Sequence, residues 1–366
     1  MKIPPRMAAV QLIGHGGFDK LVYSEAVPTP VAAAGEVLIR VRAAGVNNTD
    51  INTRIGWYSS AATTGTDEAG EGMSSPPADG DWTGGGLAFP RIQGADVCGE
   101  IVAVGDGVAT SRIGERVIVQ SCLRSQSVDA FTPWLGSERD GAFAQFVAAP
   151  AADTFRVDSD LADAELAAVP CAFGTAENLV SRAKVKAGDR VLVTGASGNV
   201  GIAAVQLARR RGADVIAVAA EAKSDALAAA GATRVVGRGN DLVDALGSAS
   251  IDVVIDVVGG PRWADLFEVL KVRGRCCVSG AIAGPIVQFD LRKLYLKDLT
   301  IHGCTSQDPQ VFGDLVSYIE RGEIRPLVSR ILPLADIGTA QREFMGKSHV
   351  GKIVLVPPPL PQDLES

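Results

Sequence analysis

The spacing of apolar positions changes about halfway along the chain. In the first 150 residues, short β-branched runs such as "EVLIRVRAAGV", "DVCGEIVAVG", "ERVIVQS" and "AFAQFVAAP" are separated by Gly and Pro, which is typical of a compact, mostly β domain. From about Asp189, apolar runs of strand length alternate with Ala-rich runs of helix length. This alternation predicts βαβ units around a parallel sheet.

Six parallel strands are expected in this second region, and they fit a doubly wound α/β sheet. We place them at Arg190–Thr194, Asp214–Val218, Arg234–Val236, Asp252–Val257, Arg275–Ser279 and Leu299–His302. After the helix-like stretch "PQVFGDLVSYIERG", β-like pieces return, so the end of the chain is expected to complete the first domain. The predicted domains are residues 1–156 with 323–366, and residues 157–322.

Residues 59–90 form a segment with few bulky apolar side chains and many Gly, Ser, Thr and Pro residues. Such a composition cannot supply a packed core, so it predicts a long flexible loop within the first domain. The sequence leaves open whether this loop covers a substrate or is a neutral surface insertion.

Length and charge narrow the classes of function. A chain of 366 residues with 47% hydrophobic content can bury two cores, and a net charge of -7 without a long basic run gives no electrostatic reason to expect nucleic acid. The first residues do not have the pattern of a signal peptide, and no stretch has the length and apolar character of a membrane span. We expect a soluble, cytoplasmic protein that acts on small molecules.

A glycine-rich turn lies between a predicted strand and a predicted helix within residues 190–220. Gly195, Gly198 and Gly201 give the spacing G-x-x-G-x-x-G. Glycines allow a tight turn and let main-chain N–H groups approach a pyrophosphate at the positive end of the helix. A plain strand-to-helix turn is the alternative, but the surrounding βαβ unit is the context that a dinucleotide motif requires. The other expected loop contacts are Ser197, Asn199 and Val200.

The second strand of this unit ends without an acid. Asp or Glu commonly binds the adenosine ribose there, but Ala219 takes that place. Lys223 and Arg238 follow and could reach a 2′-phosphate, although both could equally be solvated surface cations, and Glu221 argues weakly against a phosphate. The pattern favours NADPH over NADH.

Further cofactor contacts are expected where later strands end, because ligands of such sheets bind at the carboxyl edge. Asp256 precedes one of these turns, and we expect the acid to fix the turn rather than to touch the cofactor. The expected contacts are Val257, Val258, Ser279, Gly280 and Ala281.

Motifs along nearly the whole chain resemble those of the medium-chain dehydrogenase/reductase family. They are "GEVLIRVRAAGVNNTD", "QGADVCGEIVAVG", "GERV", "GAFAQFV", "GASGNVG", "DVVIDVVGG", "LYLKDLTIHG" and "HVGKIVLVP". The resemblance implies a chaperonin-10-like (GroES-like) β domain interrupted by a Rossmann domain, with the active site in the cleft between them. It also implies cofactor contacts at Thr175 and Lys352, and a homodimer formed through edge strands of the Rossmann domain.

The places of the catalytic zinc ligands in alcohol-oxidising members of the family are altered. Asn47 stands at the place of the first cysteine ligand, Ala95 and Asp96 at that of the histidine, and Cys171 at that of a third ligand. One thiolate cannot make the site of three protein ligands that catalytic zinc needs. Cys122 alone stands where structural zinc would need four cysteines. We therefore predict no metal, and Cys171 is interpreted as a buried thiol.

Without the metal, the chain resembles the zinc-free quinone oxidoreductases and, close to them, the enoyl thioester reductases. Asn47, Asp50 and Tyr58 match those branches. By this resemblance, Tyr58 could donate a hydrogen bond or a proton to the anion that forms when hydride arrives, and Asn47 could bind the nicotinamide ribose or a carbonyl substrate. Structural roles stay open, as a rim residue for Tyr58, a turn residue for Asn47 and a first-turn helix acid for Asp50.

The predicted function is zinc-independent hydride transfer from NADPH to a quinone or an α,β-unsaturated carbonyl. An enoyl thioester reductase acting on acyl-CoA or acyl-carrier substrates is the nearest alternative. A non-catalytic NADPH-binding protein is the alternative from another class. His15, His302 and His349 fall in no catalytic pattern and are interpreted as structural.

Overall fold

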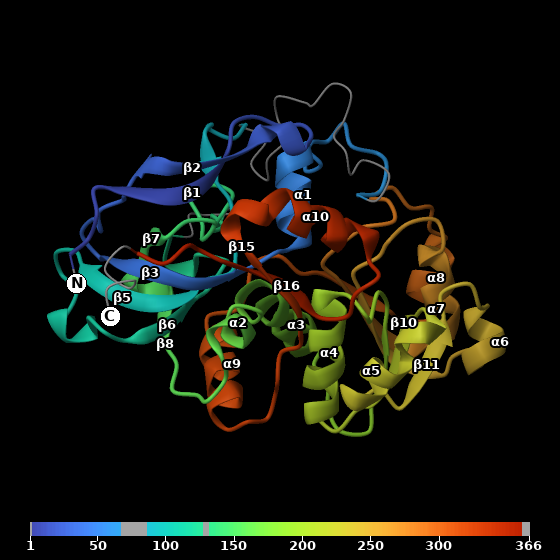
Figure 1. Cartoon of the computed structure of the whole chain (residues 1–366). Coiled ribbons are helices and arrows are strands. Elements are labelled where there is room, and N and C mark those ends of the chain that lie inside the picture. Colours follow the sequence, from blue (N-terminus) through green and yellow to red (C-terminus); the bar gives the residue numbers. More distant parts are fainter. Residues whose placement is uncertain (1, 67–85, 127–131, 361–366) are drawn as a thin grey trace. The chain divides into compact units, whose positions relative to one another are not determined.

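The computed structural model describes residues 2–66, 86–126 and 132–360 (Figure 1). Most of the predicted 59–90 loop, residues 67–85, lies outside them. The chain divides into two compact units, of which the first holds the described parts of 2–61, 86–171 and 326–360, and the second holds 62–66 and 172–325. Residues 157–171 thus belong to the first unit rather than the second, because helix α2 (Asp163–Leu166) packs on strands β3 (Glu36–Gly45) and β5 (Cys98–Val104).

The described strands of the first unit form two sheets. The larger has the order β15-β16-β3-β5-β6-β8, with β7 paired to β3, and the smaller has the order β2-β1-β4. The remaining strands are β15 (Val328–Pro333), β16 (Lys352–Val356), β6 (Arg116–Val119), β8 (Thr154–Arg156), β7 (Phe146–Pro150), β2 (Leu21–Pro28), β1 (Arg6–Leu12) and β4 (Arg91–Ile92). Strand β16 pairs with β3 in antiparallel fashion. The end of the chain therefore completes a sheet whose first strand lies near the start of the chain.

Two longer helices belong to the first unit. Helix α1 (Asn48–Ile55) follows β3, and α10 (Ile337–Gly346) lies between β15 and β16. The sequence predicts only β-like pieces in the latter stretch. Helix α10 forms there because Ile337, Ala340 and Gln341 lie on one face of the helix and are buried.

The second unit contains a six-stranded sheet in the order β11-β10-β9-β12-β13-β14, in which all neighbouring strands are parallel. The strands are β9 (Arg190–Val193), β10 (Asp214–Ala219), β11 (Arg234–Gly237), β12 (Ile251–Asp256), β13 (Leu270–Val278) and β14 (Thr300–Gly303). The predicted doubly wound parallel sheet is confirmed. Strand β13 begins at Leu270, earlier than predicted. The residues after Leu270 are mostly polar, and Arg273 adopts a φ of 62°, so the start of the strand has no strand-like pattern in the sequence.

Helices pack around this sheet, with α4 (Asn199–Arg210) against β9 and β10 and α5 (Ser224–Ala229) against β11. Ile202, Val205 and Ala208 of α4 are buried at helical spacing. The other described α-helices of this unit are α3 (Pro170–Arg182), α6 (Leu242–Leu246), α7 (Leu266–Val269), α8 (Leu291–Leu296) and α9 (Val311–Glu320). No helix of the described ranges has the length and apolar character that a membrane span requires.

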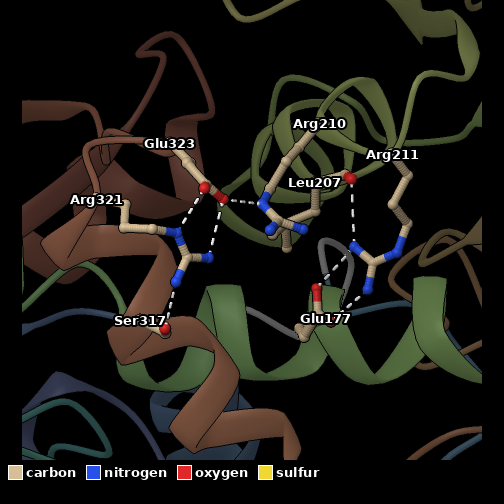
Figure 2. Close-up of polar contacts among 7 residues, drawn as sticks. All are labelled: Glu177, Leu207, Arg210, Arg211, Ser317, Arg321 and Glu323. Carbon is tan, nitrogen blue, oxygen red and sulfur yellow. Dashed lines mark hydrogen bonds and ion pairs between the residues drawn. The ribbon is translucent and has the colours of Figure 1, made fainter.

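Two arginines at the end of α4 join it to α3 and to the segment after α9 (Figure 2). Arg211 Nη1 donates to Glu177 Oε2 of α3 at 3.0 Å, and the Glu177 side chain is only 1% exposed. Arg210 Nε donates to Glu323 Oε2 at 2.5 Å, and Arg321 Nε donates to the other Glu323 oxygen at 2.6 Å. These ion pairs connect α4, which packs on β9 and β10, to α3 and to the segment after α9.

Candidate functional site

The glycine loop joins β9 to α4. Gly195 adopts a φ of 55°, and a Cβ at this position would lie 3.0 Å from Cγ2 of Val258. In the first turn of α4, a Cβ on Gly201 would lie only 2.2 Å from the Gly195 carbonyl oxygen. Glycine at both positions therefore lets the helix start directly against the loop. The first-turn N–H groups of α4 have no intrahelical acceptor, which is the arrangement that can bind an anion at the start of a helix.

Asp256, at the end of β12, organises the next turn of the same edge. Its Oδ1 accepts from Thr194 Oγ1 at 2.5 Å and from Val258 N at 3.1 Å, and its Oδ2 accepts from Gly259 N at 3.2 Å. The side chain is buried, and this burial raises the pKa of the carboxyl group. As expected, the acid fixes the turn rather than presenting itself to a ligand.

Four turns meet at the carboxyl edge of the sheet, those after β9, β10, β12 and β13. Ala196 N donates to Val218 O at 3.2 Å, and Ser279 N donates to Asp256 O at 3.1 Å. A Cβ on Gly280 would lie 2.9 Å from Val257 O. The structure thus brings together the predicted contacts of the glycine loop, the end of β10 and the turns after β12 and β13.

The residues predicted to determine the preference for NADPH or NADH follow β10 and β11, the two neighbouring strands at one end of the sheet. Ala219 is buried and pairs with Gly237 of β11, so Arg238 comes one residue after the neighbour of Ala219. Arg238 is exposed, and Lys223 is half-buried in the turn after β10. Thr175 is half-buried on α3. Lys352, the remaining predicted cofactor contact, lies in the first unit.

A group of buried polar side chains, here called the Lys352 cluster, consists of Asn47, Asp96 and Lys352. Lys352 Nζ donates to Asp96 Oδ2 at 2.7 Å and to Asn47 Oδ1 at 2.6 Å. Asn47 Nδ2 donates to the same Asp96 oxygen at 2.8 Å. Each of the three residues is at most 3% exposed. Buried charges persist when they are paired and hydrogen-bonded, and here both conditions hold.

Backbone groups complete the Lys352 cluster. Asp96 Oδ1 accepts from Cys171 N at 2.6 Å. A Cβ on Gly45 would lie 2.4 Å from Asp96 Oδ2 and 3.1 Å from Lys352 Cδ, so the cluster requires glycine there. The pairing of Lys352 with Asp96 was not predicted. Its signal in the sequence is one charged residue inside each of two apolar stretches, "GKIVLV" and "QGADVCG".

The amide of Asn47 is engaged on both sides. In addition to the contacts with Lys352 and Asp96, its Nδ2 donates to Gly45 O at 3.3 Å. The predicted hydrogen bond from Asn47 to a ribose or a carbonyl substrate would have to use a proton that is engaged in these contacts. That role stays a prediction, and the contacts themselves are those of a structural residue.

Asp50 lies in the first turn of α1. Its Oδ2 accepts from Asn47 N at 2.8 Å, and its Oδ1 accepts from Gly94 N at 3.2 Å. Burial raises the pKa of Asp50 to about 7, although the bond from Asn47 N opposes the shift, and the nearby Asp96 carboxylate adds to it. These are the contacts of a first-turn helix acid, which is the structural role that the sequence left open.

Tyr58 follows α1 and is half-buried. Its hydroxyl donates to Thr49 Oγ1 at 3.2 Å, and its ring meets Trp57 edge to face at 5.7 Å. Burial raises the pKa of Tyr58 well above that of an ordinary tyrosine. The phenol therefore stays protonated near neutral pH, as a hydrogen-bond or proton donor must.

The residues at the zinc-ligand places do not fit a catalytic zinc. The Lys352 ammonium lies between Asn47 and Asp96, and burial raises the pKa of the Cys171 thiol, with the Asp96 charge raising it further. A cysteine binds a metal ion as the thiolate, and these surroundings disfavour the thiolate form of Cys171. Within residues 2–66, 86–126 and 132–360, no group of three or more His, Cys, Asp and Glu could hold a metal ion.

Comparisons with known proteins agree with both units. Residues 33–159 match the alcohol dehydrogenase GroES-like domain, and residues 199–321 match the zinc-binding dehydrogenase family. A solved structure of a putative alcohol dehydrogenase from Sinorhizobium meliloti 1021 is 48% identical, with a TM-score of 0.88 over 97% of this chain and 98% of that one. The predicted fold class, a Rossmann sheet plus a GroES-like β domain, is confirmed.

Two curated relatives have more specific names. Acryloyl-coenzyme A reductase of Metallosphaera sedula is 29% identical over 95% of this chain and 99% of its own length. Quinone oxidoreductase of Rattus norvegicus is 26% identical over 96% of this chain and 98% of its own. The range that matches the zinc-binding family contains none of Asn47, Asp96 and Cys171.

Proposed function

This chain belongs to the medium-chain dehydrogenase/reductase superfamily of oxidoreductases, and we propose that it transfers hydride from NADPH to a quinone or to the β-carbon of an α,β-unsaturated carbonyl compound, without a metal ion. The observation that supports the proposal is the buried pair of Lys352 with Asp96, because Asp96 stands where the resemblance puts a zinc ligand and is already neutralised by the lysine. Conjugated acceptors fit such a site because their carbonyl group already activates them toward hydride.

Binding and orientation are the main contributions of the second unit. The first turn of α4 and the glycine loop would bind the pyrophosphate, and the turn fixed by Asp256 would border the nicotinamide half. When bound, NADPH supplies a hydride from nicotinamide C4. Holding donor and acceptor in one geometry removes much of the entropic cost of their encounter.

The balance of the reaction assigns a role to the first unit. A C–H bond forms at the β-carbon, the alkene electron pair moves to the carbonyl oxygen, and the α-carbon then takes a proton. The Tyr58 hydroxyl, which is protonated near neutral pH and donates to Thr49 in the structure, would turn its proton from Thr49 Oγ1 toward that oxygen, either as a hydrogen bond or as the proton supplied.

NADPH is the proposed coenzyme because the edge of the sheet offers no acid at Ala219 and carries Lys223 and Arg238 just beyond. A carboxylate at the end of β10 would repel a 2′-phosphate. An exposed guanidinium at Arg238 can pair with a phosphate at little cost in desolvation.

An anaerobic assay of NADPH and NADH oxidation against quinones, enones and enoyl thioesters tests the function. We expect turnover with at least one acceptor class and a higher kcat/KM with NADPH. Cofactor binding without turnover of any acceptor would instead favour the non-catalytic NADPH-binding protein.

Enoyl thioester reduction is the second candidate, supported by the relative named acryloyl-coenzyme A reductase. The variant Tyr58→Phe separates the two acceptor classes, since it removes only the hydroxyl. A large loss of kcat with enoyl thioesters would favour this candidate. Unchanged kcat with quinones would favour quinone reduction.

A homodimer through the edge strand β14 is proposed as well. Strand β14 exposes Ile301, and helix α8, which precedes it in the chain, exposes Leu291, Tyr295 and Leu296 at 62–70%. A second copy that extends the sheet at β14 would pair the open edge of this strand. Light scattering should give a dimer mass for the wild type and for Val31→Lys, and a monomer mass for Ile301→Lys. A monomeric wild type would contradict the proposal.

A further inference from the structure

We propose that the ammonium group of Lys352 is a built-in substitute for a bound metal ion, which holds Asn47 and Asp96 in one geometry and keeps divalent cations out. The inference goes beyond the hydride transfer proposed above, and it does not depend on the identity of the acceptor. It rests on the buried contacts of Lys352 with Asn47 and Asp96, two residues that stand where the sequence resemblance puts the catalytic zinc ligands.

The coordination of the ammonium group carries the first step. Its nitrogen lies 2.7 Å from a carboxylate oxygen of Asp96 and 2.6 Å from the amide oxygen of Asn47. Carboxylate and amide oxygens are ligands that hard divalent cations also take, at somewhat shorter distances. The two oxygens therefore converge on one point, and a positive charge is already fixed there.

The backbone holds this charge in position. Lys352 begins β16, and its main-chain N donates to Leu327 O at 2.8 Å. The next residue, Ile353, accepts from Val46 N at 2.9 Å, so β16 is bonded beside Asn47. Gly45 adds a close fit, because any side chain there would collide with Asp96. An ammonium group on this strand cannot exchange or be removed by a chelator.

Through Asn47, the ammonium group also affects the position of helix α1 and of Tyr58. Lys352 holds the Oδ1 of Asn47, and Asn47 is the residue before α1. Thr49, in the first turn of α1, accepts the hydrogen bond from the Tyr58 hydroxyl. Lys352 is thus a positioning residue for the start of α1 and, through it, for Tyr58.

Truncation to Lys352→Ala removes the ammonium and leaves the oxygens of Asn47 and Asp96 beside the Cys171 thiol. The probes are n-propylammonium, which replaces the lost part of the side chain, and Co²⁺, whose absorption reports thiolate coordination. We expect the variant to have a lower Tm that n-propylammonium or Co²⁺ raises. Tetramethylammonium, with the same charge but no N–H group, should not raise it.

Lys271→Ala is the matched control, because Lys271 pairs with Asp252 at 2.8 Å but is 41% exposed. Neither probe should raise the Tm of this variant. A folded Lys352→Ala protein that responds to neither probe, or that responds equally to tetramethylammonium, would overturn the inference.

The wild type provides a second test that does not depend on the folding of the variant. After incubation with Zn²⁺ or Co²⁺ and gel filtration, it should retain far less than one ion per chain and show no cobalt–thiolate absorption. Stoichiometric retention in wild type would overturn the inference. Loss of turnover with every acceptor would sink the proposed function but leave these cation measurements intact, so the two failures are distinguishable.

Discussion

The glycine-loop edge of the second unit and the Lys352 cluster of the first unit handle charge in opposite ways. At the edge, main-chain N–H groups and the absence of side chains on Gly195 and Gly201 prepare a place for an anion from outside. In the cluster, side chains bring their own cation and anion and engage one another when buried. In the proposed function, the first region receives a charged ligand, whereas the second is already neutralised by its own side chains.

We expect the largest effect from a substitution that breaks the Lys352 cluster. Lys352→Met leaves the Asp96 carboxylate buried without its cation, which should lower the free energy of unfolding by about 3–5 kcal/mol. Urea unfolding measures the loss. The double variant Lys352→Met/Asp96→Asn should be more stable than the single one, because it buries no unpaired charge. Equal losses in both would contradict the account of the cluster.

The second prediction concerns the pH dependence of stability that comes from Asp50, which accepts a hydrogen bond from the main chain of Asn47 next to the Lys352 cluster. Burial raises the pKa of Asp50 to about 7 in the folded protein, whereas an unfolded Asp titrates near about 3.9. Folding therefore favours the protonated acid, and this contribution is complete below about pH 4 and is lost as the pH rises to about 7.

The difference in free energy of unfolding between wild type and Asp50→Asn isolates this contribution. Relative to the variant, the wild type should lose about 1.4 kcal/mol of stability for each pH unit between about pH 4 and about pH 7, and little more above that. A difference that stays constant with pH would show that the carboxyl group of Asp50 has an ordinary pKa.

A smaller effect is expected at the edge, where Gly201→Ala breaks the close approach of α4 to the loop. The new Cβ would lie 2.2 Å from the Gly195 oxygen, and such overpacking costs about 1–3 kcal/mol. The Kd for NADPH, measured by calorimetry, should rise accordingly. Gly313→Ala on α9 is the control, since no other heavy atom lies within 4 Å of its Cβ. A Gly201→Ala protein with the wild-type Kd would contradict this use of the loop.

The smallest effect concerns the choice of coenzyme at the same edge. Removing both cations in Lys223→Ala/Arg238→Ala should raise KM for NADPH about tenfold, the equivalent of one charge-assisted hydrogen bond. KM for NADH should not change, because NADH has no 2′-phosphate. Equal changes with both coenzymes would mean that these side chains only support the fold.

The edge could be predicted from the sequence almost completely, because its determinants are local. Each of the six strands was expected within a few residues of its place, apart from the early start of β13. The glycine spacing and Asp256 occur within single strand-to-turn segments. A short stretch of sequence therefore contains both the motif and the context that gives it meaning.

The cluster could be predicted only in part, because its members come from distant segments. The sequence singled out Asn47 and Asp96 as altered ligand places, and Lys352 only as a cofactor contact. What joins them is the pairing of β16 with β3, a long-range contact that no local pattern reports. Helix α10 was not predicted either, because its buried face is short and follows a strand.

The most direct test of the central claim combines turnover and metal analysis on one sample. Wild-type protein dialysed against a strong chelator should still oxidise NADPH anaerobically with its acceptor at the undialysed rate, while elemental analysis finds far less than one metal ion per chain. Turnover that disappears on dialysis and returns with stoichiometric zinc would contradict the account.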